Sequence, residues 1–157
     1  MRVQGMAGSK RAARSKAKPA EYETYLFRIL AIEPSYLILS SQTAVGTSDT
    51  GEYLHPEIRA VCESPSKLKG RETRLTFLAS RTMLDDEKRG TSLGTLTIRG
   101  QRSEYVGTIP MDIAISLPNT IAVGGYRWIH LHGATLKHGT ARIQSVGFFH
   151  EVDPDDY

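Results

Sequence analysis

The sequence predicts a single all-β domain, mainly antiparallel, built as a small sandwich or partly closed barrel with at most one short helix and ending in a hairpin. Two observations support this fold class. Short segments rich in β-branched and aromatic residues recur along the chain and are separated by Gly, Pro and Ser. In addition, residues 126–150 (YRWIHLHGATLKHGTARIQSVGFFH) have the pattern of two strands joined at His138-Gly139, whereas a helix there would have to include several glycines.

The size and composition are those of one soluble globular domain, with 157 residues, 39% hydrophobic and 24% charged side chains. The single cysteine, Cys62, excludes an internal disulfide. The chain has no apolar run long enough to span a membrane and no hydrophobic signal segment at its start. We therefore expect a cytoplasmic protein that makes no contact with membranes and holds no cofactor.

Charge is distributed unevenly along the chain. The net charge is +3, but residues 1–20 alone carry +6 and no acid, so the remainder sums to 3 − 6 = −3, and acids are concentrated in residues 151–157. This pattern predicts a disordered basic arm over residues 1–20, a single β-rich domain over residues 21–150 and an acidic tail over residues 151–157. Because Met6 follows Met1 so closely, either methionine is a candidate start.

The first two predicted strands lie at the beginning of the domain. Residues 22–32 carry apolar side chains on both faces, as an interior strand does, although a helical period fits several of them too. Residues 36–40 form the second, which we expect to pair antiparallel with the first because the connection through Pro34 is short. Residues 41–55, rich in Ser, Thr and Gly, are expected to form a long exposed loop that offers binding residues.

The middle of the chain continues the β pattern. Residues 57–63 alternate, with Ile58, Ala60 and Cys62 on one face, and a lone Cys in such a pattern indicates a small core residue rather than a nucleophile. Consecutive acids within residues 83–90 favour a solvated turn over a metal site. The other predicted strands are residues 73–79, 93–99 and 104–109, the last two paired across residues 100–102.

Residues 110–123 fit two patterns at once. Alternation of apolar and polar residues favours a strand, whereas one helical face, Pro110 at the start and Gly124 at the stop favour a helix. The sequence favours short helical structure, with Pro118 arguing against one continuous helix.

The terminal hairpin has a specific predicted register. A two-residue turn at His138-Gly139 pairs Lys137 with Thr140, Leu136 with Ala141, Leu131 with Val146 and Ile129 with Phe148. The apolar positions change phase near Gly133 on both strands. The change predicts either a β-bulge at Gly133 that re-aims the strand or a bent hairpin that covers two surfaces.

One candidate site lies on this hairpin. His130 and His132 share a strand face, an H-x-H arrangement that can place two imidazoles near one metal ion, but no third ligand follows at a suitable spacing. His138 lies at the turn, and His150 is expected on the opposite face. The pattern therefore favours a ligand-contacting or partner-contacting surface over a metal site, formed by Tyr126, Trp128, His130 and His132.

The second candidate is a nucleic-acid or anion contact built from basic residues. No phosphate-loop spacing is present, and Glu63 and Glu72 flank the basic turn, so a solvated arm and turn are favoured over a binding site. The residues concerned are Lys10, Arg11, Arg14, Lys16 and Lys18 in the arm and Lys67, Lys69 and Arg71 in the turn, with Arg74 just beyond.

The sequence contains no catalytic triad order, Walker loop, dinucleotide-binding fingerprint or zinc-finger spacing. It favours a non-catalytic binding or protein-interaction module that uses residues 41–55 and the aromatic face of the hairpin. One alternative is a nucleic-acid-binding protein that uses the basic arm. The least favoured alternative is a His-dependent metalloenzyme of β-barrel type.

Overall fold

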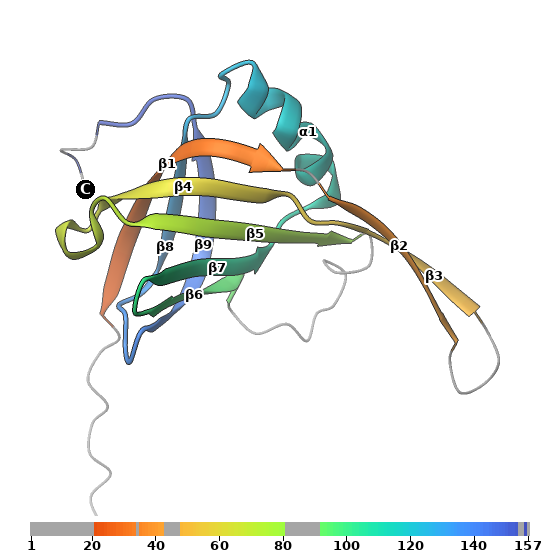
Figure 1. The fold of residues 1–157 in the computed structure, drawn as a ribbon, viewed down its shortest axis with the longest axis horizontal. Coiled ribbons are helices and arrows are strands. Elements are labelled where there is room, and N and C mark those ends of the chain that lie inside the picture. Colours follow the sequence, from red (N-terminus) through yellow and green to blue (C-terminus); the bar gives the residue numbers. More distant parts are fainter. Residues whose placement is uncertain (1–20, 34, 43–47, 81–91, 154–155, 157) are drawn as a thin grey trace, which may run out of the picture.

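The structure is a computed structural model that describes residues 21–33, 35–42, 48–80, 92–153 and 156. Seven of its strands form a closed barrel (Figure 1). In order around the barrel they are β1 (Tyr22–Glu33), β4 (Glu57–Ser64), β5 (Glu72–Ser80), β7 (Arg102–Thr108), β6 (Gly94–Arg99), β9 (Thr140–Phe149) and β8 (Trp128–Ala134). The prediction of a mainly β domain is confirmed, and the barrel closes because β5 also pairs with β7.

One pair of neighbouring strands departs from the antiparallel expectation. β5 and β7 run parallel, with Leu75 beside Tyr105 and Phe77 beside Gly107, while the other barrel pairs are antiparallel. The hairpin formed by β6 and β7 therefore presents its second strand to β5. Closure leaves each barrel strand paired on both sides, which removes the exposed strand edges of an open sheet.

Alternation along the strands places large apolar side chains inside the barrel. Tyr25 and Phe27 of β1 are at most 1% exposed, and the Phe77 ring lies 5.4 Å from the rings of both Tyr105 and Phe148. The face predicted for residues 57–63 is confirmed, since the structure buries Ile58, Ala60 and Cys62 of β4. Strand β5 likewise buries alternate residues, namely Thr73, Leu75, Phe77 and Ala79.

Helix α1 (Met111–Ala122) covers one end of the barrel (Figure 1). It buries Ala114 and Leu117, and its last residue and the C-cap Val123 are followed by Gly124, whose positive φ of 75° suits glycine. The predicted helical structure is confirmed, but the prediction that Pro118 interrupts it is wrong. Proline removes one backbone donor from the helix, and burial of the neighbouring apolar side chains offsets that loss.

Strands β2 (Tyr36–Gln42) and β3 (Ser48–Leu54) correct two predictions. β2 pairs with β3 and not with β1, because β1 already pairs with β4 on one side and β8 on the other. The loop predicted over residues 41–55 is largely strand, and residues 43–47 lie outside the described part of the chain. The two strands form a ribbon that projects from the barrel (Figure 1), joined to β5 where Leu54 pairs with Ala79.

Three of the four pairs predicted for the hairpin of β8 and β9 are present, and the fourth, Leu136 with Ala141, is not among the strand pairs. Ile129 pairs with Phe148, Leu131 with Val146 and Lys137 with Thr140. His138 and Gly139 form the turn with φ values of 52° and 77°, as a two-residue turn requires. His132 pairs with Ser145 but Gly133 with Ile143, so the β-bulge alternative is confirmed, with Gln144 as the extra residue.

This bulge decides which side chains reach the core. Without it, Ile143 and Val146 would fall on opposite faces of β9, because side chains alternate along a strand. The extra residue restores the phase, so that Ala141 and Ile143 are buried in the barrel core and Val146 and Phe148 pack against it. The alternative of a bent hairpin covering two surfaces is therefore wrong.

Replacement of Gly133 is expected to destabilise the barrel strongly. A Cβ atom there would meet the carbonyl oxygen of Arg142 and lie 2.7 Å from Cα of Ile143, and backbone atoms cannot move aside cheaply. We expect Gly133→Ala to lower the free energy of unfolding by about 3 kcal/mol in urea denaturation. The control is Gly147→Ala, where the closest atom, at 2.6 Å, belongs to the ring of Phe149 and can rotate away. Equal losses in the two variants would contradict a close backbone approach at Gly133.

Two buried tyrosines are expected to respond oppositely to loss of the hydroxyl group. The Tyr105 hydroxyl is buried with no hydrogen-bond partner among the described residues, whereas Tyr25 donates to the Ala134 carbonyl at 2.9 Å. Tyr105→Phe should leave the free energy of unfolding unchanged or raise it by about 1 kcal/mol, and Tyr25→Phe should lower it by about 1 kcal/mol. Denaturant titrations of both variants test this, and a clear loss in Tyr105→Phe would reveal a partner for that hydroxyl.

Candidate functional site

A row of aromatic and imidazole rings lies on the outer surface of the barrel, over β1, β8 and the end of β9. Alternation along β8 buries Ile129 and Leu131 and turns the residues between and beside them outward. The pairing of β1 with β8 then brings Thr24 beside His132 and Leu26 beside His130. We call this surface the aromatic face, and it consists of Tyr22, Thr24, Trp128, His130, His132 and Phe149.

Four of the rings follow one another in close contact. The Tyr22 ring stacks on His132 with a centroid distance of 5.9 Å and an interplanar angle of 17°. His132 lies 6.4 Å from His130, which in turn lies 6.0 Å from Phe149. The two outer members are accessible, since Tyr22 is 51% and Phe149 40% exposed, and Trp128 adjoins the row because it pairs with Phe149.

Thr24 connects the two imidazoles. Its hydroxyl lies 3.1 Å from Nδ1 of His132 and 3.4 Å from Nε2 of His130. A hydroxyl has one hydrogen and two acceptor lone pairs, so it donates to one ring at most and can accept from both. At least one of these two ring nitrogens therefore carries a proton while both contacts persist.

The geometry of the described residues gives little support to a metal centre. Among them, no group of three or more His, Cys, Asp or Glu side chains is arranged to hold one metal ion. His138 lies at the hairpin tip, and Nδ1 of His150 donates to the Gly124 carbonyl at 2.8 Å.

Tyr126 does not belong to the aromatic face, which corrects the prediction. Its ring lies 5.6 Å from Phe148 and packs against the barrel core. The aromatic face instead includes Tyr22, Thr24 and Phe149, which the sequence had not indicated. The alternation of β8 was readable from the sequence, but the partner strand was not, because Thr24 and His132 are 108 residues apart.

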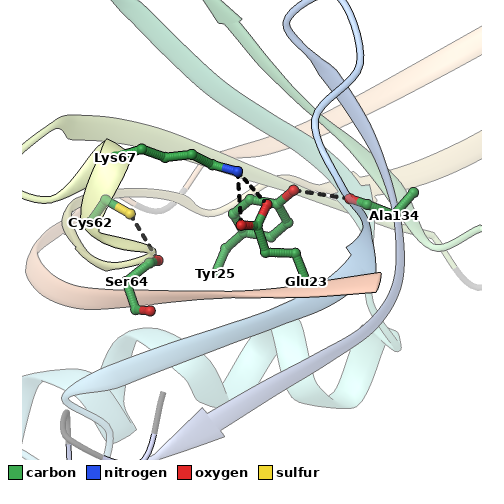
Figure 2. A network of polar contacts seen from close by, with 6 residues as sticks. All are labelled: Glu23, Tyr25, Cys62, Ser64, Lys67 and Ala134. Carbon is green, nitrogen blue, oxygen red and sulfur yellow. Dashed lines mark hydrogen bonds and ion pairs between the residues drawn. The ribbon is translucent and has the colours of Figure 1, made fainter. Parts of the chain in front are cut away.

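The basic turn does not form an anion cradle. Nζ of Lys67 donates to both carboxylate oxygens of Glu23, at 2.8 and 2.9 Å, and Arg71 donates to the Gly100 carbonyl at 2.6 Å. Figure 2 shows this Lys67–Glu23 pair beside the Tyr25 hydroxyl. Lys69 is exposed, and the five arm residues predicted to contact nucleic acid lie outside the described part of the chain. Lys67 and Arg71 thus each have a partner within the protein, and contact of Lys67, Lys69 and Arg71 with an anion stays a prediction.

A shallow hollow of about 250 Å³ lies on a different part of the barrel, lined from β4, β5 and β7. Three arginines line it, and each has a carboxylate nearby: Arg59 with Glu72 at 3.4 Å, Arg74 with Glu57 at 3.1 Å and Arg102 with Glu104 at 3.0 Å. These pairs offset most of its positive charge, so the hollow offers little net attraction to an anion.

Cys62 is a core residue, as predicted. Its side chain is buried, and Sγ donates to the Ser64 carbonyl at 3.1 Å (Figure 2). Burial raises the pKa of the thiol to about 12. The reactive thiolate is therefore not populated near neutral pH, and a nucleophilic role is not supported.

Compared with known protein families, curated proteins and solved structures, the chain matches none of them. The described residues also include no helix that is long and apolar enough to cross a membrane.

The pKa of His130 provides a test of this geometry. Partial burial, and secondarily the neighbouring His132, lowers this pKa from its usual value near 6.5. The unfolded chain then binds its proton at a higher pH than the native chain. The contribution of His130 to stability is thus present above about pH 6.5 and decreases as the pH falls through the lower native pKa.

An NMR titration of the imidazole resonances measures this shift directly. We expect His130 to titrate below about pH 6.5 in the native protein and near that value in concentrated urea. Replacement of its neighbour, His132→Gln, removes the second cause and should raise the native pKa of His130 part of the way back. A native His130 that titrates at or above the denatured value would show that its ring is not packed as described.

Proposed function

We propose that the protein is a non-catalytic binding module and that the aromatic face is its contact surface. The observation that carries this proposal is the uninterrupted row of four rings on the outside of a closed barrel, where strands usually present polar side chains. Exposed and clustered aromatic residues are typical of binding surfaces and otherwise favour unwanted association.

The row suits a ligand or partner with planar groups. Tyr22 and Phe149 are two ring surfaces on which an aromatic side chain or a nucleobase can stack. His130 and His132 add ring nitrogens that donate or accept hydrogen bonds. Because the residues lie on paired strands, the rings are held in place before a ligand arrives, which lowers the entropic cost of binding.

The chemistry of the described residues supports binding rather than catalysis. Cys62 keeps its proton inside the barrel, and the two imidazoles of the aromatic face both contact the Thr24 hydroxyl. The basis for a metalloenzyme is weaker still, because the H-x-H pair has no third ligand among the described residues.

Intrinsic fluorescence gives a direct test, because Trp128 is the only tryptophan and lies in the aromatic face. We expect a ligand found by thermal-shift screening to change the Trp128 emission, and its affinity to fall roughly 5-fold or more in Phe149→Ala. The control is Val123→Ser, which removes a side chain that is 83% exposed but lies after α1. Ligands whose affinities are the same in Phe149→Ala and the wild type would place the binding surface elsewhere.

A further inference from the structure

We propose that two copies of the chain pair through the outer edge of β2, so that their β2–β3 ribbons join into one continuous antiparallel sheet. This contact is independent of the aromatic face, which lies over β1, β8 and the end of β9. Three features of the ribbon support it: an unpaired strand edge, the absence of charge along that edge, and backbone groups that complement those of a second copy.

β2 has one unpaired edge. Its residues pair with β3, from Tyr36 with Leu54 to Gln42 with Ser48, and with no other strand among the described residues. A two-stranded ribbon by itself is marginally stable in water, and additional strands stabilise it. The ribbon projects from the barrel (Figure 1), so a strand of a second chain can approach this edge.

The β2 edge lacks the features that protect natural edge strands. Such strands usually carry a lysine, a proline or a β-bulge that prevents pairing with another chain. Residues 36–42 (YLILSSQ) contain no charged residue and no proline, and their register with β3 is regular throughout. β3, by contrast, carries Asp49 and Glu52, and its last two residues pair with β5. Of the two outer edges of the ribbon, β2 is therefore the one suited to pairing.

The composition of β2 also favours a place inside a sheet. Residues 36–39 are Tyr, Leu, Ile and Leu, and because successive residues of a strand lie on opposite faces, both faces of β2 carry apolar residues. Pairing of two ribbons through β2 would move these residues from the edge of a sheet to its centre. Apolar contacts between the two β2 strands would then add to the backbone hydrogen bonds.

One hydrogen bond shows which backbone groups of β2 face the open edge. The His55 amide donates to the Ser35 carbonyl at 2.9 Å, just before β2 begins. In an antiparallel ladder, residues whose N–H and C=O groups face the partner strand alternate with residues whose groups face away. The groups of Leu37, Leu39 and Ser41 therefore point toward β3, and those of the even-numbered residues of β2 point to the open edge.

These outward groups match those of a second copy. Around a two-fold axis at Leu39, position 38 of one chain lies opposite position 40 of the other, and position 36 lies opposite position 42. Each outward N–H then meets an outward C=O, and no like charges are brought together, because β2 carries none. An unrelated partner would need an open edge strand of its own, whereas each copy of this chain already has one.

Two proline variants at paired positions test which edge of the ribbon is used. Ser40 pairs with Thr50, and both N–H groups point away from the β2–β3 ladder, because position 40 is an outward position. Ser40→Pro therefore removes a donor from the β2 edge, and Thr50→Pro removes one from the β3 edge. Neither variant removes a hydrogen bond between β2 and β3, so Thr50→Pro is the matched control.

Analytical ultracentrifugation of the full chain measures the association. We expect a monomer–dimer equilibrium within the range from about 1 μM to 1 mM. Ser40→Pro should raise the dimer dissociation constant by roughly 10-fold or more, because both copies lose a hydrogen bond, whereas Thr50→Pro should leave it unchanged. Melting temperatures show whether the barrel stays folded in each variant.

Cross-linking tests the register. The two Leu39 residues form a non-hydrogen-bonded pair, with Cα atoms about 4.5 Å apart, whereas the two Ser41 residues are displaced along the strands by roughly 14 Å. A disulfide requires Cα atoms closer than about 7 Å. With oxidised glutathione as the oxidant, Leu39→Cys should therefore give a disulfide-linked dimer on a non-reducing gel, and Ser41→Cys should not. Cys62 does not compete, because it is buried in the barrel.

A dimer that Ser40→Pro weakens and Thr50→Pro does not, together with cross-linking through Leu39→Cys alone, supports the proposal. A wild-type chain that stays monomeric over the whole range overturns it, as does a dimer that both proline variants weaken equally or that neither affects. Equal cross-linking of the two cysteine variants also overturns it. A dimer that Phe149→Ala weakens and Ser40→Pro does not would overturn it in favour of self-association through the aromatic face.

Discussion

The structure depends on the pairing of β1 with β8, because this pair joins segments of the closed barrel that lie about a hundred residues apart in the chain. β1 must satisfy both this partner and β4. Its twelve residues bend between them, with register irregularities at Leu26/Phe27 and Ile29/Ala31 that re-aim the chain. The hydrogen bond from the Tyr25 hydroxyl to the Ala134 carbonyl and the Thr24 contacts with two histidines tie the same pair together from opposite faces.

Local features of this fold were predictable from the sequence. The alternation in residues 57–63 and 73–79, the two-residue turn at His138-Gly139 and the bulge opposite Gly133 follow from side-chain periodicity and glycine conformation. The composition of residues 41–55 concealed a strand, because Ser, Thr and Gly carry no apolar signal in a ribbon that projects from the barrel. The helix through Pro118 was obscured because the strength of its packing is a tertiary property.

Some residues of the candidate site could likewise be predicted from the sequence, and others could not. Trp128, His130 and His132 could be recognised because they alternate on one strand. Tyr22 and Thr24 could not, because their place beside β8 is a contact across more than a hundred residues that no local pattern encodes. Tyr126 was assigned to the face because it continues the same alternation, but it precedes β8, and its ring packs against Phe148. Non-local pairing therefore decides both closure of the barrel and membership of the aromatic face.

The aromatic face lies across the paired strands β1 and β8, here called the β1–β8 seam. The face therefore forms only when the barrel folds and this seam closes. Pairing of such distant segments carries a large loop-closure entropy and is a slow step in all-β proteins. Chains in which this seam has not yet closed, or has reopened, hold Tyr22 and Thr24 apart from the histidines. A ligand that contacts both strands would stabilise the closed seam and slow its opening. Such a ligand would therefore protect the native chain from proteolysis.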